Sequence, residues 1–140
     1  MSEFEATASS TPTNVHDFLG IRTIEATSDK VVLELDVTPR VHQPFGILHG
    51  GVSALLAEGA ASLGGLVSVN PGQTCVGTEL NISHLRPFRT GVLTATATPI
   101  RRGRTVQVWS IVMTDERGRQ ISVARCSMQI IGSMGSPVST

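Results

Sequence analysis

The chain has 140 residues, of which 40% are hydrophobic and 16% are charged, and its formal net charge is zero. This length and apolar content fit one domain with its own hydrophobic core. Zero net charge, one Trp and no Tyr argue against a nucleic-acid-binding protein, because such proteins combine a basic surface with stacking aromatic side chains. The sequence shows no basic leader segment, so we also expect no membrane partner.

The cysteines and histidines point to neither a disulfide framework nor a metal site. Cys75 and Cys126 have no Cys-x-x-Cys spacing, so we expect reduced thiols in a cytoplasmic protein. The four histidines, at positions 16, 42, 49 and 84, show none of the spacings of a metal site. We therefore predict no metal and no resident cofactor.

The first half of the chain predicts two strands and one long helix. Residues 1–12 are rich in Ser, Thr and Pro, and we expect a flexible N-terminus there. A short helical turn at residues 15–21 leads into strands at 21–26 and 30–39, the second of which alternates apolar and polar side chains (KVVLELDVTP). A loop with one Pro and three Gly then precedes a helix over residues 50–68, which NPGQ terminates.

The second half predicts four longer strands, at residues 74–87, 91–102, 104–115 and 120–131. The segments RRGR and ERGR are hairpin signals between the last three of them. Residues 132–140 are again rich in Ser, Gly and Pro, and we expect a flexible tail there. The fold class is therefore α+β: one domain over residues 13–131, in which a long antiparallel sheet wraps around one central helix.

The predicted helix is apolar or small on every side except for one carboxylate, Glu58. A helix of this kind must be buried on every side, and one sheet covers it only in part. We expect a second copy of the chain to cover the rest; the alternative is a monomer whose helix lies on one face of the sheet. Glu58 is a candidate base or nucleophile, or else an acid that reaches a wet interface or pairs with an Arg.

The helix begins at two glycines, Gly50 and Gly51, directly after His49. The first N–H groups of a helix lack internal partners and stand at the positive end of its dipole. Glycine lets a ligand approach this backbone closely, and a thioester carbonyl that becomes an oxyanion fits such surroundings. The alternative is a tight joint between loop and helix.

Spacing along the helix predicts that two chains share each site. Glu58 follows Gly50 by eight residues, which is about 12 Å along the axis, so the two groups do not reach the same carbonyl carbon within one chain. Two antiparallel helices from two chains would place the start of one beside the middle of the other. Ser62, one turn beyond Glu58, shares its helix face.

Polar residues before the helix and after it are further candidates. Gln43 and His49 precede the glycines and are candidates for orienting a carbonyl or a water, although a loop Gln usually lies on the surface and a lone His is usually structural.

Ten of the eleven basic residues are Arg, and guanidinium groups bind phosphates through paired hydrogen bonds. The arginines near strand ends are candidates for the phosphates of coenzyme A, or else solvated hairpin residues: Arg86, Arg89, Arg101, Arg102 and Arg104.

The segment QPFGILHGGVSALLAEGAAS, followed by VGTELNISHLRP, QVW and DERGR, resembles the hotdog-fold thioesterases over about residues 18–131. It is most similar to the branch of the Arthrobacter-type 4-hydroxybenzoyl-CoA thioesterases and the 1,4-dihydroxy-2-naphthoyl-CoA thioesterases. The combination of Gln, His-Gly-Gly, Glu and Ser at these spacings carries the resemblance. The related phenylacetate-pathway branch has an Asp where this chain has Glu58.

The resemblance implies a role for each catalytic candidate. Glu58 would be the nucleophile or the general base, and the Gly50 N–H of the partner chain would polarise the thioester carbonyl. Gln43 and His49 would help to place the thioester group. Ser62 would hold the attacking water or the Glu58 carboxylate.

The same resemblance implies a substrate and an assembly. Gly51 and His84 would contact the substrate, His84 at the acyl ring, and the chain would form a dimer of dimers. The implied reaction is hydrolysis of a hydroxybenzoyl- or dihydroxynaphthoyl-CoA-like thioester to the free acid and coenzyme A, which is part of the substrate. The alternatives are a non-catalytic acyl-CoA-binding protein, a thioesterase for medium-chain aliphatic acyl-CoA, and a hotdog dehydratase, whose usual His with an acidic partner is not evident here.

Overall fold

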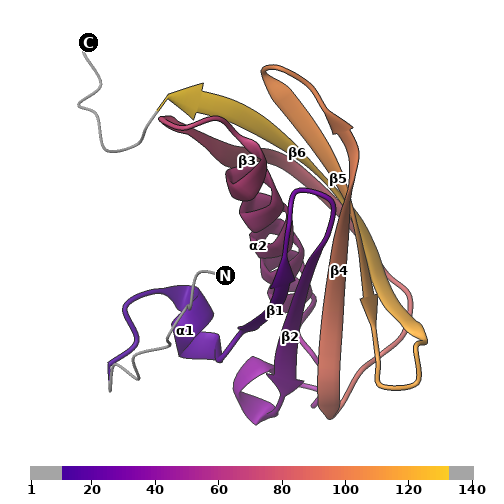
Figure 1. Ribbon diagram of the computed structural model, residues 1–140. Helices are drawn as coiled ribbons and strands as arrows, with labels where there is room; N and C mark the ends of the chain where they lie inside the picture. The colour runs from indigo at the N-terminus through magenta and orange to yellow at the C-terminus, as the bar shows by residue number, and fades with distance from the viewer. Residues whose placement is uncertain (1–10, 133–140) are drawn as a thin grey trace.

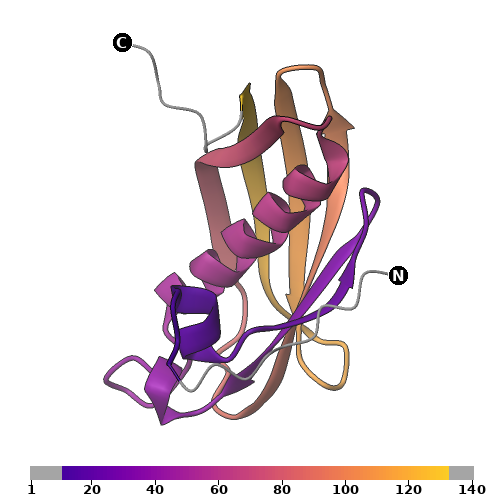
Figure 2. The same ribbon diagram turned by 60° about the vertical axis from the view of Figure 1, so that its left-hand side comes forward.

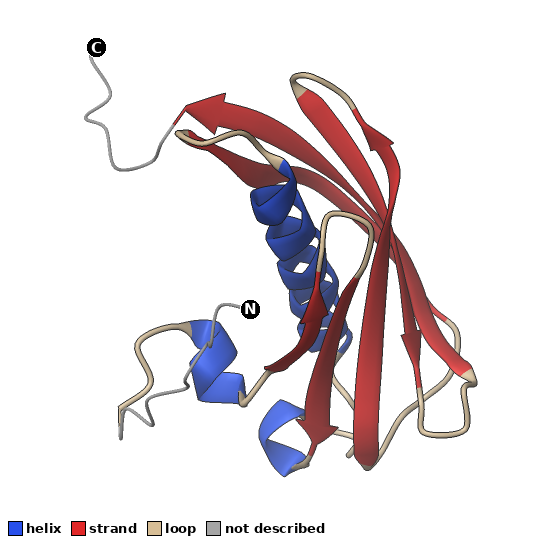
Figure 3. Cartoon of the chain, viewed as in Figure 1, coloured by secondary structure: helices blue, strands red, loops and turns tan. Residues whose placement is uncertain are grey.

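The computed structural model describes residues 11–132, so the predictions for the two ends of the chain lie almost wholly outside the described residues. The predicted helix and strands are all present, and a short 3-10 helix, η1, is added between β2 and α2 (Figures 1 and 3). In chain order the elements are α1 (Val15–Leu19), β1 (Arg22–Ala26), β2 (Val31–Val37), η1 (Pro39–Val41), α2 (Gly50–Ser68), β3 (Gln73–His84), β4 (Gly91–Arg102), β5 (Val106–Thr114) and β6 (Gln120–Gly132).

The six strands form one antiparallel sheet in the order β1-β2-β4-β5-β6-β3. The sheet curves around α2, which crosses its concave face (Figures 1 and 2). This confirms the predicted architecture of a long antiparallel sheet around one central helix. The chain leaves α2 into β3 at one edge of the sheet, and β6 later pairs with β3 along its length.

The core lies between α2 and the concave face of the sheet. Every second side chain of β2, and of β4 from Leu93 to Ala97, is buried there, as the alternation in their sequences predicts. Trp109 of β5 is fully buried and its ring lies on Gly64 of α2, where an added Cβ would be 2.5 Å from the indole Cη2. The indole Nε1 donates a hydrogen bond of 2.8 Å to the buried Gln107 side chain, so the indole N–H is not left unpaired.

The outer face of α2 is not covered by the described part of the chain, although α1 lies against part of it (Figure 2). The His16 ring contacts Gly59, where an added Cβ would be 2.4 Å from the ring Cε1. Glu58 is exposed and Leu66 is 52% exposed, so all-round burial of α2 is not achieved within one chain.

By length and composition α2 meets the criterion for a membrane-spanning helix, although no membrane partner is predicted from the sequence. The core helix of a water-soluble domain meets the same criterion when its apolar face packs on a sheet. One face of α2 packs in this way on the sheet.

Candidate active site

The His49 side chain caps the start of α2. Its Nδ1 accepts a hydrogen bond of 2.8 Å from the Gly51 N–H, which satisfies one of the backbone donors that a helix start leaves open. A Cβ at Gly51 would lie 2.9 Å from this nitrogen. The second glycine of the pair therefore makes room for the cap.

The first glycine makes room for a second histidine. The His84 ring, from the end of β3, lies over Gly50, where an added Cβ would be 2.7 Å from Nε2. On its other side the ring contacts the Ser122 hydroxyl, with 3.1 Å between Nδ1 and Oγ. Ser122 is fully buried in β6, so it fixes the position of the ring.

The N–H groups at the start of α2 are not all satisfied. Those of Val52 and Ser53 donate to the carbonyl of His49, and that of Gly51 donates to its side chain. Between residues 11 and 132 the Gly50 N–H has no hydrogen-bond partner. A free donor at the positive end of a helix dipole is a site for a developing oxyanion.

Gly50 lines a cavity of about 380 Å³. Its walls come from the loop before α2, the start of α2, the segment after β3 and the start of β6. Most of its wall side chains are apolar, among them Leu48, Phe88 and Ile121. The predicted site residues Gln43, Gly50, His84 and Arg86 all line it, so the structure brings together four candidates from two stretches of the chain, residues 43–50 and 84–86.

Gln43 also shapes the loop that forms one wall of this cavity. Its side-chain oxygen accepts a hydrogen bond from the Phe45 N–H, and Gly46 follows with a φ of 79°, a value that favours glycine. Phe45 stands at the tip of this loop and is 85% exposed.

Glu58 does not line the cavity of its own chain. Its carboxylate lies against Gly77 of β3, where an added Cβ would be 2.8 Å from Oε1. Ser62 lies on the same helix face, one turn further on, but in the described structure the two side chains do not form a hydrogen bond. The role of Ser62 therefore stays a prediction.

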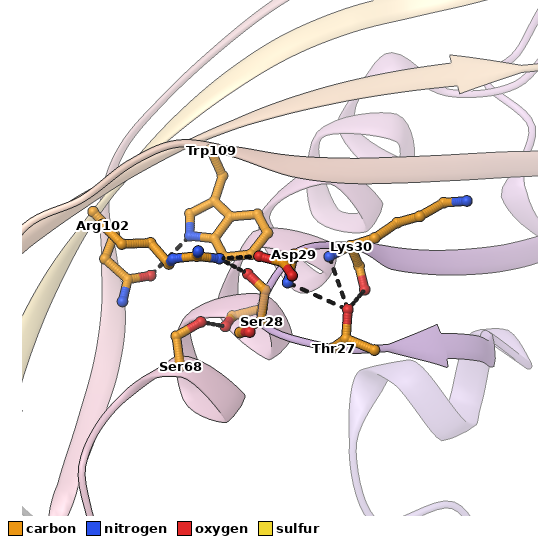
Figure 4. A network of polar contacts seen from close by, with 9 residues as sticks. Thr27, Ser28, Asp29, Lys30, Ser68, Arg102 and Trp109 are labelled. Carbon is orange, nitrogen blue, oxygen red and sulfur yellow. Dashed lines mark hydrogen bonds and ion pairs between the residues drawn. The ribbon is translucent and has the colours of Figure 1, made fainter.

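The arginine candidates do not form one cluster. Arg86 lines the cavity, and the Arg89 guanidinium lies beside Gly46 of the neighbouring loop. Arg102 instead holds the β1–β2 turn: it donates to the Ser28 carbonyl and, at 2.9 Å, to the Asp29 carboxylate (Figure 4). Arg104 lies in the β4–β5 turn. Contact of these arginines with phosphate stays a prediction.

The remaining titratable groups give no sign of a metal site or a reactive thiol. Within residues 11–132, no three His, Cys, Asp or Glu side chains gather where they could hold a metal ion. Both cysteines are free and buried. Burial raises the pKa of the Cys75 thiol, and burial together with the charge of Glu58 raises the pKa of the Cys126 thiol to about 11.

Sequence reasoning missed three residues at the site: Ser53, Gly77 and Ser122. Ser53 and Ser122 line the cavity and are 2% and 0% exposed. A signal for both was present, because each is a polar residue at a position that the helix or strand periodicity assigns to the core. Gly77 carried no such signal, since its contact with Glu58 depends on how β3 lies beside α2.

Comparison with known proteins agrees with this geometry. The model of the thioesterase superfamily matches residues 45–122, which include all of α2 and β3. The chain is 42% identical to a 1,4-dihydroxy-2-naphthoyl-CoA hydrolase of Listeria monocytogenes over 116 residues, 83% of this chain and 94% of the relative. It is 44% identical to the proofreading thioesterase EntH of Klebsiella pneumoniae over 99 residues, 71% of this chain and 72% of the relative.

The fold comparison gives the same result. A crystal structure of a thioesterase from Haemophilus influenzae superposes with a TM-score of 0.84 at 39% identity, covering 89% of this chain and 87% of that one. The chain therefore belongs to the thioesterase superfamily, has its hotdog fold and is a thioester hydrolase.

Proposed function

We propose that this enzyme hydrolyses an aryl-CoA thioester to the free acid and coenzyme A. The observation that carries the proposal is the unpartnered Gly50 N–H at the start of α2, in the wall of a mainly apolar cavity. The cavity is large enough for an aromatic acyl group. The named relatives add support, because one of them acts on 1,4-dihydroxy-2-naphthoyl-CoA. A coenzyme A thioester as substrate also agrees with the predicted cytoplasmic location.

In the proposed reaction the thioester carbonyl oxygen accepts a hydrogen bond from the Gly50 N–H. Glu58 either attacks the carbonyl carbon directly or takes a proton from the water that attacks it. The oxyanion that forms is stabilised by the same N–H and by the helix dipole. The C–S bond then breaks, the thiolate of coenzyme A leaves and takes up a proton, and the acid is released; if Glu58 attacked, water first hydrolyses the mixed anhydride.

The proposed site needs Glu58 from a second chain, since Glu58 does not line the cavity of its own chain. The arrangement of β3 supports such a dimer. β3 is an edge strand with twelve residues, so one row of its backbone N–H and C=O groups is available for pairing. Its Gly77 contacts Glu58, and antiparallel pairing of two β3 strands would therefore place two antiparallel α2 helices side by side, with Glu58 near their junction.

The test is the Glu58→Gln variant, assayed by thiol release from benzoyl-, hydroxybenzoyl-, dihydroxynaphthoyl- and octanoyl-CoA. We expect kcat to fall by about 10²–10⁴-fold, the usual contribution of a positioned acid or base, while the thermal unfolding midpoint changes little because Glu58 is exposed. Glu25→Gln is the matched control, since Glu25 is an exposed acid on β1, at the opposite edge of the sheet from β3.

Two results would contradict the proposal. Wild-type kcat in Glu58→Gln would remove Glu58 from the mechanism. Octanoyl-CoA hydrolysed faster than every aryl ester would make the protein a thioesterase for aliphatic acyl groups, and binding without thiol release would make it an acyl-CoA-binding protein.

A further inference from the structure

Ser53 is a buried hydroxyl without a partner. It is 2% exposed, in the first turn of α2, and its Oγ forms no hydrogen bond in the part of the chain that the structure describes. By contrast, Ser68 in the same helix donates to the Gly64 carbonyl. Because leaving a buried polar group unpaired costs free energy, this hydroxyl needs a partner from outside the chain, a water or a bound ligand.

The surroundings of Ser53 show where that partner lies. Ser53 lines the same cavity as Gly50, and no polar side-chain atom among the described residues is both sealed from solvent and unpaired, so the hydroxyl meets the cavity. The Ser122 hydroxyl is already engaged by His84. The other polar residues of the cavity wall, Gln43, His84 and Arg86, form no hydrogen bond with Ser53 in the described structure, which leaves a molecule bound in the cavity.

We propose that Ser53 is a specificity-determining residue that binds a hydroxyl group on the acyl ring, at the carbon next to the one that bears the thioester carbonyl. This inference rests on the proposed function, because it takes the carbonyl oxygen to bind at Gly50. Ser53 follows Gly50 by three residues, about 4.5 Å along the axis, and helical side chains lean back toward the N-terminus. Its Oγ therefore lies beside the carbonyl, where an ortho group and not a para group would be.

The substrate class follows from this position. An ortho-hydroxylated aryl thioester would donate to or accept from Ser53, whereas an unsubstituted ring leaves the buried hydroxyl unpaired. Sites built to hydrogen-bond a substrate hydroxyl discriminate strongly against analogues that lack it. The Listeria relative is named for a 1,4-dihydroxy-2-naphthoyl group. In that group one hydroxyl is on ring carbon 1, next to carbon 2, which bears the thioester carbonyl, so it is ortho to the carbonyl as proposed here.

The experiment compares wild type with Ser53→Ala on three esters: 2-hydroxybenzoyl-, 4-hydroxybenzoyl- and benzoyl-CoA. Ser53→Ala removes only an oxygen that has no partner in the chain and places a better helix former in α2, so we expect it to fold. For 2-hydroxybenzoyl-CoA, kcat/KM should fall about tenfold or more, while the values for the other two esters stay within about twofold. Ser68→Ala is the matched control, and it should leave kcat/KM for each of the three esters unchanged.

A binding measurement separates this inference from the proposed function. In the Glu58→Gln background, calorimetry gives the affinity for the same three esters with and without Ser53→Ala. A loss confined to the 2-hydroxy ester supports the role of Ser53 even if wild type hydrolyses none of them, in which case the proposed function alone fails. Equal losses for all three esters, or a wild type without preference for the 2-hydroxy ester, would overturn the inference.

Discussion

Three glycines at the site each make room for a polar side chain. Gly50 lies under His84, Gly51 beside His49 and Gly77 against the Glu58 carboxylate, and at each of them an added Cβ would come within 3 Å of that side chain. None of the three has a positive φ, so the reason for glycine is close approach and not backbone conformation. Substitution there is expected to displace a functional group before it disturbs the fold.

Gly77→Ala tests this expectation at Glu58. The added Cβ would lie 2.8 Å from Oε1, and because the carboxylate is the free end of an exposed side chain, it moves aside at little cost to stability. A displacement on the order of 1 Å is enough to lower turnover by about 10²-fold. We expect kcat to fall by about 10–100-fold with an unchanged unfolding midpoint.

The control for this variant is Gly132→Ala, because nothing lies within 4 Å of a Cβ at Gly132. It should keep the activity and stability of wild type. An active Gly77→Ala enzyme would show that the position of the carboxylate against β3 does not matter for turnover.

Asp115 in the β5–β6 turn makes stability depend on pH. Burial raises the pKa of its carboxyl, but hydrogen bonds from Arg119 and Arg117 outweigh this effect, and the pKa lies below its ordinary value. A lowered pKa in the folded state stabilises the protein above the ordinary pKa of about 3.9, and this stabilisation is lost as pH falls through the folded-state pKa.

The prediction from Asp115 concerns the Asp115→Asn variant. Its unfolding midpoint should lie below that of wild type at pH 7, and the difference should shrink as pH falls below about 4. Asp29→Asn, at an aspartate whose side chain is 80% exposed, should show a smaller difference at pH 7. If the difference in unfolding midpoint between wild type and Asp115→Asn is the same at pH 7 and pH 3, the charge of Asp115 is not the cause of the destabilisation.

The two thiols should be inert in the folded protein. Cys75 and Cys126 are buried, and the raised pKa of each thiol, about 11 for Cys126, keeps it protonated at neutral pH. Iodoacetamide at pH 8 should therefore modify neither cysteine in the native protein and both in denaturant, as counted by mass spectrometry. Modification of native Cys126 would show that this part of the β3–β6 pair opens readily.

Among single residues, candidates could be grouped from the sequence only where they stand close together along the chain. Gly50 and Gln43 could be assigned to one site because they stand close to each other at the start of a helix, and the structure places both at the cavity. Gly77 could not be predicted, because its role arises only when β3 lies beside α2. Arg102 was grouped with the phosphate candidates by its place in a hairpin, but its ion pair with Asp29 joins residues far apart in the sequence.

At the scale of elements, the contact between α2 and β5 fixes the helix on the sheet. A Cβ at Gly64 would be 2.5 Å from the Trp109 ring, which is fully buried and has no room to move. Gly64→Ala should therefore lower the free energy of unfolding by about 1–3 kcal/mol, the usual cost of overpacking, even though Ala is the better helix former. Chemical denaturation measures this change.

Gly59→Ala is the matched variant on the other side of α2. The added Cβ would meet His16, whose ring belongs to the five-residue helix α1 and can turn away. We expect a change within about 1 kcal/mol, because the gain in helix propensity offsets a small displacement. If both variants are equally destabilised, the rigid indole is not the cause.

The elements themselves were predictable because each has a strong local period. The alternation in β2 and β4 and the NPGQ stop after α2 indicate strands and a helix with nearly the observed bounds. The order of strands in the sheet was not predictable in this way. β3 and β6 pair along their length although β4 and β5 lie between them in the sequence, and no local pattern encodes that pairing.

At the scale of the whole molecule, the proposed exchange of Glu58 between chains can be tested by mixing two inactive variants. Glu58→Gln removes the acid, and Gly50→Pro removes the N–H, at a helix position where proline is tolerated, and places a Cβ against the His84 ring. His49, with φ −67° and ψ 127°, has a conformation compatible with a following proline. Coexpression of the two variants should restore about a quarter of wild-type activity, because random pairing makes half of the dimers hybrids with one complete site.

The double variant Glu58→Gln, Gly50→Pro is the control for that experiment. Coexpressed with wild type, it leaves both sites of each hybrid dimer incomplete, and expressed alone it should stay inactive. If the two single variants regain no activity although light scattering shows mixed assemblies, both groups act within one chain.

The burial of Trp109 has a practical consequence for all of these measurements. It is the single Trp of a chain without Tyr, it is fully buried, and it touches both the sheet and Gly64 of the central helix. Its fluorescence therefore reports on one contact, the seating of α2 on the sheet, with no background from other indoles. A shift of its emission to longer wavelength would signal that the helix has left the sheet, which makes unfolding visible from a single site in the unlabelled protein.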